Sequence, residues 1–235
     1  MLYSPTAHVA FAHYPKTAGC SLFHWFTTVL PDALHLDAAE PHMNVRRGLQ
    51  HLGIGEPRAS QRWRRPLDWL TARNPFLAAD RSAPRIIGVL REPFEMLVSL
   101  YEFWQQTPAA LDVPPFIATA RNGTFRDFVW MAVLKKELVR YEDFFDVGGP
   151  AWEHTRLIDF HSLEAGLAAV SAEFGIPGGQ PLERINAGGG RKHSLREYRA
   201  SVATMVMDIR RHFRWYYEHG VRLMVRGPAP RRVAA

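Results

Sequence analysis

The clearest signal of a fold in this sequence is His8-Val9-Ala10-Phe11-Ala12-His13-Tyr14-Pro15-Lys16-Thr17-Ala18-Gly19-Cys20-Ser21. Its first six residues form a short β-prone apolar run, which Tyr14 and Pro15 close. Apolar residues then recur at three- and four-residue spacing over 21–30, which predicts a helix that Pro31 ends. Residues 15–21 therefore form a tight loop between a strand and a helix.

The same order of elements returns twice along the chain. Residues 85–90 are a continuous apolar run typical of a strand buried on both faces, and Pro93 begins a helix. Residues 156–160 are a third strand candidate, followed by a helix over 163–174. Further helices are predicted over 43–52, 66–70 and 125–138, and a last one runs from the Ser194 and Glu197 capping box to Tyr216. We therefore predict an α/β fold with a P-loop-like, mostly parallel central sheet flanked by helices.

Composition limits the class of protein. The 235 residues are 47% hydrophobic and 22% charged, which is ordinary for a globular chain and favours a single domain over 1–235. No apolar run is long enough to span a membrane and no secretory signal is present, so we expect a cytoplasmic protein. One cysteine and no H-x-x-x-H spacing give no reason to expect a disulfide or a metal.

The charge of the chain favours an anionic ligand. The net charge is +6, and only four of the 29 basic residues are lysines. The remaining arginines are suited to forked recognition of sulfate, phosphate or carboxylate. We do not expect nucleic acid as the partner, because no nucleic-acid-binding motif accompanies the charge.

The loop over 15–21 has the chemistry of an anion site. The N-terminus of a helix offers N–H groups and about half a positive charge. Lys16 adds a full charge, Thr17 and Ser21 add hydroxyl groups, and Gly19 allows close approach of the backbone. It is not a Walker loop, because Lys16 follows Pro15 and precedes the glycine. The alternative interpretation is an ordinary turn with an exposed lysine.

A second motif follows the strand predicted over 85–90. Arg91 stands at the carboxyl end of that strand, where doubly wound sheets bind their ligands, and Ser99 lies two helical turns later. Taken alone, Arg91 is better explained as a structural residue in a salt bridge.

Together the two motifs resemble those of the sulfotransferases that use 3′-phosphoadenosine-5′-phosphosulfate (PAPS). Residues 11–22 resemble their 5′-phosphosulfate loop, F-x-H-x-P-K-T-[AG]-G-[TS]-S, and residues 89–101 resemble their 3′-phosphate motif. The resemblance is closest to carbohydrate sulfotransferases of the heparan-sulfate 2-O-sulfotransferase-like kind, bacterial members included. It implies PAPS as donor, no metal, and donor contacts from Pro15, Lys16, Thr17, Ala18, Gly19, Cys20, Ser21, Arg91 and Ser99. Cys20 stands where the family generally has Thr or Ser.

The resemblance also implies an acceptor with a hydroxyl group, and the expected classes are carbohydrates and glycolipids. Lys16 would stabilise charge on the departing phosphate. His42 is the first candidate for the base, because relatives carry a histidine in this segment, and His13 is the second. Residues 31–84 would build the acceptor side, and Arg191 and Lys192 would either cover the donor or belong to a solvated linker.

Two other functions stay open at this point. One is a nucleotide kinase of the P-loop type, which would bind ATP and magnesium. The other is a non-catalytic module that binds polyanions. The sequence decides neither the acceptor nor the oligomeric state.

Overall fold

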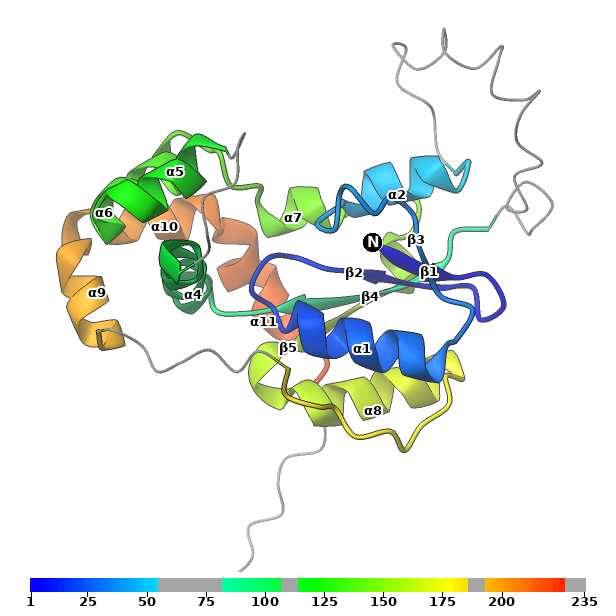
Figure 1. Cartoon of the computed structure of the whole chain (residues 1–235). Coiled ribbons are helices and arrows are strands. Elements are labelled where there is room, and N and C mark those ends of the chain that lie inside the picture. The colour runs from blue at the N-terminus through cyan, green and yellow to red at the C-terminus, as the bar shows by residue number, and fades with distance from the viewer. Residues whose placement is uncertain (55–81, 107–113, 186–192, 227–235) are drawn as a thin grey trace, which may run out of the picture.

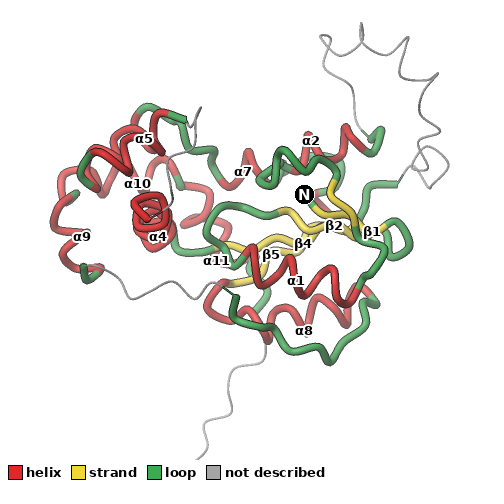
Figure 2. Tube along the Cα trace, viewed as in Figure 1, coloured by secondary structure: helices red, strands yellow, loops and turns green. Residues whose placement is uncertain are grey.

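The computed structural model describes residues 1–54, 82–106, 114–185 and 193–226. These residues form an α/β molecule in which helices flank a mixed sheet (Figures 1 and 2). Within them the sheet has five strands in the order β3-β1-β2-β4-β5. The strands are β1 (Leu2–Ser4), β2 (Val9–Ala12), β3 (Leu34–His35), β4 (Arg85–Leu90) and β5 (Thr155–Asp159). The predicted α/β class is confirmed.

The three strands predicted from the sequence are parallel neighbours. β2 pairs with β4 in the register Val9↔Arg85, and β4 pairs with β5 in the register Ile86↔Thr155. The sheet as a whole is mixed rather than mostly parallel, because β1 is antiparallel to both β2 and β3. The sequence analysis missed β1, since a three-residue strand is too short to show a period-2 pattern.

The helices occupy most of the remaining described chain. They are α1 (Gly19–Val29), α2 (Val45–His51), α4 (Pro93–Gln106), α5 (Pro115–Asn122), α6 (Phe125–Val129), α7 (Tyr141–Phe144), α8 (Leu163–Phe174), α9 (Leu195–Ser201), α10 (Val206–His212) and α11 (Val221–Leu223). Short 3-10 or π-helical turns are η3 (Trp130–Leu134), η4 (Trp152–His154), η5 (Phe160–Ser162), η6 (Ala203–Met205) and η7 (Tyr216–Gly220). The helix predicted over 66–70 lies outside the described residues.

Alternate residues of each strand face opposite sides of the sheet. Val9 and Phe11 of β2 belong to the apolar cluster built with α1 and α8, whereas Ala10 and Ala12 belong to the second, larger cluster. Figure 1 shows α1 and α8 beneath the sheet and α2 and α7 above it. Helices α4, α5, α6, α9 and α10 gather beyond the end of the sheet at which β4 leads into α4.

Two predicted helices are less regular than expected. The last one begins with the predicted Ser194 capping box but breaks at Val202 and resumes as α10 and η7. The helix predicted over 125–138 ends as α-helix at Val129 and continues as the π-helical turn η3. In both segments the apolar side chains still reach the larger cluster, so burial overrides regular helical geometry.

Candidate active site

The candidate site lies at the edge of the sheet where β2, β4 and β5 all end. The loop after β2 leads into α1, Arg91 and Glu92 join β4 to α4, and Phe160 follows β5 directly. Carboxyl ends of parallel strands are where open α/β sheets bind ligands. The two sequence motifs therefore meet at one edge.

The loop after β2 is tightly curled. Lys16 and Ala18 both have a left-handed backbone, with φ of 62° and 61°. Thr17 between them is only 1% exposed, and its hydroxyl donates to the carbonyl oxygen of Tyr14 at 2.8 Å. The hydroxyl hydrogen of Thr17 is thus used inside the loop, and what Thr17 can offer an anion is its backbone N–H.

The first turn of α1 is not capped by a side chain. Its N-cap is Ala18, which has no polar side chain, and no acidic residue stands in the first turn. The first N–H groups of a helix have no partner within the helix. This end of α1 therefore presents donors and positive potential toward the loop.

Arg91 joins the ends of the three strands. Its Nη1 donates to the carbonyl oxygen of Lys16 at 3.2 Å, and its Nε lies 3.7 Å from Oε2 of Glu95. Its guanidinium carbon lies 4.3 Å from the centroid of the Phe160 ring. The side chain is 11% exposed. Arg91 thus braces the Lys16 loop as well as carrying charge at this edge.

The turn that carries Arg91 is held by two tyrosines. The Tyr141 hydroxyl donates to the carbonyl oxygen of Arg91 at 2.9 Å, and the Tyr217 hydroxyl donates to Oε1 of Glu92 at 2.8 Å. Oε2 of Glu92 in turn accepts from the N–H of Glu95 in the first turn of α4. Burial raises the pKa of both tyrosines, so both remain protonated donors.

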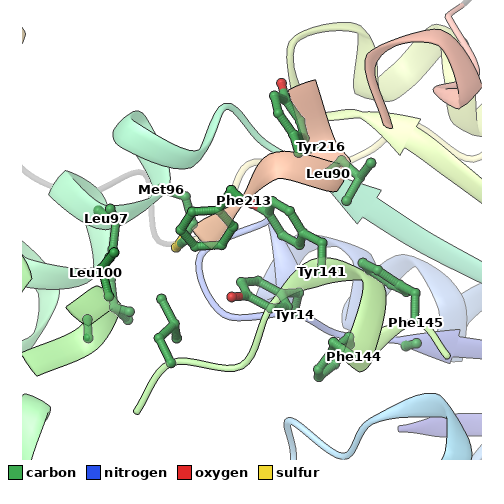
Figure 3. Close-up of a cluster of buried hydrophobic side chains, with 14 of the residues drawn as sticks. Tyr14, Leu90, Met96, Leu97, Leu100, Tyr141, Phe144, Phe145, Phe213 and Tyr216 are labelled. Atoms are coloured by element: carbon green, nitrogen blue, oxygen red, sulfur yellow. The ribbon is translucent and has the colours of Figure 1, made fainter. Parts of the chain in front are cut away.

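An aromatic cluster supports the loop and this turn together. Figure 3 shows Tyr14 of the loop beside Tyr141, with Phe213 and Tyr216 from the C-terminal helices close by. The ring centroids of Tyr14 and Tyr141 are 4.5 Å apart, and the Tyr14 hydroxyl donates to the carbonyl oxygen of Val139. The loop after β2 is therefore supported by buried aromatic side chains.

Lys16 reaches across to α4. Its Nζ lies 4.1 Å from the centroid of the Phe103 ring. Burial lowers the pKa of Lys16, and the like charge of Arg91 lowers it further. Ser99 stands one helical turn from both Glu95 and Phe103, so it belongs to the stripe of α4 that faces the loop.

His13 and His42 form a pair beside the loop. Their ring centroids are 4.5 Å apart, and Nδ1–H of His42 donates to the carbonyl oxygen of His13 at 3.1 Å. That bond leaves Nε2 of His42 as the unprotonated nitrogen of the neutral ring. Burial, followed by the neighbouring His42, the α-amino group and Lys16, lowers the pKa of His13 to about 3. Burial also lowers the pKa of His42.

Gly19 has a role that the sequence analysis did not foresee. A Cβ at this position would collide with the ring of His13. The packing of His13 on the first turn of α1 therefore requires a glycine here. This requirement is separate from the predicted one, which is close approach of the backbone to an anion.

The other predicted donor contacts fall into two groups. Pro15, Cys20 and Ser21 are part of the loop and of the first turn of α1, and Oγ of Ser21 accepts from the N–H of Ile185 at 3.0 Å. Arg191 and Lys192 lie outside the described residues.

Sequence reasoning missed the supporting residues at this edge, namely Glu95, Phe103, Tyr141, Phe160 and Tyr217. Phe103 had a usable signal, because it follows Ser99 at four-residue spacing on one helix. Tyr141 and Tyr217 had none, since they lie 50 and 125 residues from the turn that they hold.

Comparison with known proteins gives no assignment. No family model, curated protein or solved structure matches the chain. Among the described residues no group of three or more His, Cys, Asp or Glu side chains is placed to hold a metal ion. In the same part of the chain no helix is both long and apolar enough to cross a membrane.

Proposed function

We propose that the chain is a PAPS-dependent sulfotransferase that transfers a sulfuryl group to a hydroxyl of a carbohydrate or another small acceptor. The observation that carries the proposal is the hydrogen bond from Arg91 to the carbonyl oxygen of Lys16. It joins two motifs 75 residues apart, each of which resembles one half of the donor site of that family. In keeping with this, we take the fold to be P-loop-like around the loop after β2.

The residues at this edge suit a donor with two anionic ends. The 5′-phosphosulfate would lie on residues 15–21, against the Lys16 ammonium and the first turn of α1. The 3′-phosphate would lie toward Arg91 and Ser99, since a guanidinium can hold a phosphate through two N–H groups. The pKa of Lys16 is lowered partly by Arg91, which is what two cations produce when they share one site.

Two groups of this chain would take part in the transfer, one acting on the leaving group and one on the acceptor. PAPS, when bound, supplies an activated sulfuryl group whose bond to the 5′-phosphate oxygen breaks as the acceptor oxygen attacks sulfur. Lys16 would stabilise the charge that develops on the departing phosphate. Nε2 of His42 would take the proton of the acceptor hydroxyl. His13, with a pKa of about 3, is the weaker base and serves better to orient His42 through its carbonyl oxygen.

The test is transfer itself. The chain is incubated with PAPS and a panel of oligosaccharide, glycolipid and small-alcohol acceptors, and products are read by mass for one added sulfuryl group. Lys16→Ala should lower turnover about a hundredfold or more, and should weaken binding of adenosine 3′,5′-bisphosphate much less. The matched control is Lys135→Ala, whose ammonium lies over the Trp130 ring of η3.

Two results would contradict the proposal. Tighter binding of ATP with magnesium than of the bisphosphate would favour a kinase. Binding of polyanions that weakens steeply with salt, without any sulfuryl transfer, would favour a binding module.

A further inference from the structure

The partner of the Lys16 ammonium is an aromatic ring. Nζ lies 4.1 Å from the centroid of Phe103, whose side chain belongs to a residue 43% exposed. Among the described residues no carboxylate lies within ion-pair distance of Lys16, and the causes of its pKa shift include no carboxylate; the acidic group among them is the Cys20 thiol, which raises the pKa. This differs from Arg91, which has Glu95 beside it.

Whether the partner of a lysine is an aromatic ring or a carboxylate matters when that lysine has to bind an anion. A carboxylate would neutralise the ammonium and compete with phosphate for its N–H groups. The face of an aromatic ring attracts a cation through its quadrupole and leaves the net charge of the cation intact. Phe103 can therefore hold Lys16 in place without lowering the positive charge of the loop.

Lys16 is held at two points by a single unit of the fold. Arg91, at the end of β4, binds its carbonyl oxygen, and Phe103, on the following helix α4, holds its ammonium. The Phe103 ring is itself packed edge-on against Trp104, with ring centroids 5.0 Å apart. The position of the Lys16 charge is thus set relative to Arg91 by the β4–α4 unit.

We infer that Phe103 is a positioning residue for Lys16, and that its ring face sets where the lysine charge meets the sulfuryl donor. The part of this inference that concerns the donor rests on the proposed sulfotransferase function. The contact between the ring and the ammonium does not.

The contact can be tested without any substrate. The chain has only four lysines, so reductive methylation with ¹³C gives few NMR signals, which Lys→Arg variants assign. The Lys16 methyl signals should show an upfield ring-current shift that Phe103→Leu abolishes. Trp130→Leu is the matched control, and should change the shift of Lys135 and leave that of Lys16 alone.

The same spectra report the ionisation of Lys16. The ring stabilises the charged form, so Phe103→Leu should lower the pKa of Lys16 by a further half unit or so, about what a partly exposed cation–π contact is worth. Unchanged Lys16 shifts and an unchanged titration in Phe103→Leu would overturn the inference.

The functional part is tested by kinetics. Phe103→Leu should lower kcat about tenfold, change the affinity for adenosine 3′,5′-bisphosphate less than about threefold, and move the alkaline limb of the pH profile to lower pH. Phe103→Tyr keeps the ring face and should restore kcat. A rise in acceptor KM with kcat unchanged would overturn the inference, since Phe103 would then touch the acceptor instead of positioning Lys16. If the unaltered chain transfers no sulfuryl group, the proposed function fails, and the NMR titration still decides whether Phe103 holds Lys16.

Discussion

His13 shows how strongly a single residue can be shaped by its surroundings. Its ring stacks on Phe11, lies against Gly19 and touches His42. Because burial lowers its pKa to about 3 from the ordinary 6.5, the folded chain holds the neutral form and the unfolded chain takes up the proton first. The contribution of His13 to stability is therefore complete above pH 6.5 and falls as the pH drops toward 3.

We expect His13→Asn to flatten the dependence of stability on pH. Over the window from about pH 6.5 down to about pH 4, the unaltered chain should lose up to about 1.4 kcal/mol per pH unit that the variant does not lose. Urea unfolding at a series of pH values measures the difference between the two curves. His219→Asn, at an exposed position, is the control. Parallel curves for His13→Asn and the unaltered chain would show that His13 is not held neutral by the fold.

At the scale of elements, the junction between β4 and α4 depends on a distant helical turn. Tyr217 of η7 donates to Glu92, and Glu92 caps the first turn of α4 through the N–H of Glu95. The neighbouring Tyr216 is buried in the same cluster, but no hydrogen bond of its hydroxyl is found among the described residues. Two adjacent tyrosines on η7 thus differ in one hydrogen bond.

Tyr217→Phe should lower the free energy of unfolding by about 1.5–3 kcal/mol, since it removes a hydrogen bond to a carboxylate. Binding of adenosine 3′,5′-bisphosphate should weaken as well, because Arg91 loses the support of its turn. Tyr216→Phe should leave both quantities nearly unchanged. Urea unfolding and calorimetry give the two values, and equal effects of the two substitutions would show that the Glu92 contact is unimportant.

The strands and helices that could be predicted from the sequence share one property. The residue pattern that identifies each of them lies within the element itself. The runs that became β2, β4 and β5, and the periodic segments that became α1, α4 and α8, carry their pattern within the element itself. The pairing of Leu2 with His35, the burial of Val202 in the larger cluster and the hydrogen bond from Tyr217 to Glu92 depend on partners far away in the sequence. Of the site, the charged residues could be found because their types match an anion, whereas their aromatic supports look like ordinary core residues.

In the whole molecule, the parallel and the antiparallel half of the sheet lead to different parts of the candidate site. The parallel strands β2, β4 and β5 end at the Lys16 and Arg91 edge, and the antiparallel strands β1 and β3 lead to the segment that carries His42. β1 lies between β3 and β2, so β3 is attached to the sheet through β1 alone within the described strands. Damage to β1 should therefore affect the proposed acceptor side, at His42, before the proposed donor side, at Lys16 and Arg91.

We expect Tyr3→Pro to separate the two halves. Proline removes a ladder N–H from an interior strand, which should loosen β1 and β3 and displace His42. Affinity for adenosine 3′,5′-bisphosphate should stay within about threefold, while sulfuryl transfer should fall at least about tenfold. Tyr3→Phe keeps the strand and removes the bond between the Tyr3 hydroxyl and Nδ1 of His8, so it serves as the control. Equal loss of binding and transfer in Tyr3→Pro would show that the two halves are not separable.

The hydrogen bond from Tyr217 to Glu92 also has a consequence for folding during synthesis, because it cannot form until Tyr217 has been made. A ribosome releases the Lys16 loop and Arg91 long before Tyr217, which comes 125 residues after Glu92. Contacts of such wide sequence separation form late, after local helices and hairpins. A nascent chain therefore carries its cationic loop without the final support of the Arg91 turn until η7 has been made, and this edge reaches its final geometry only then.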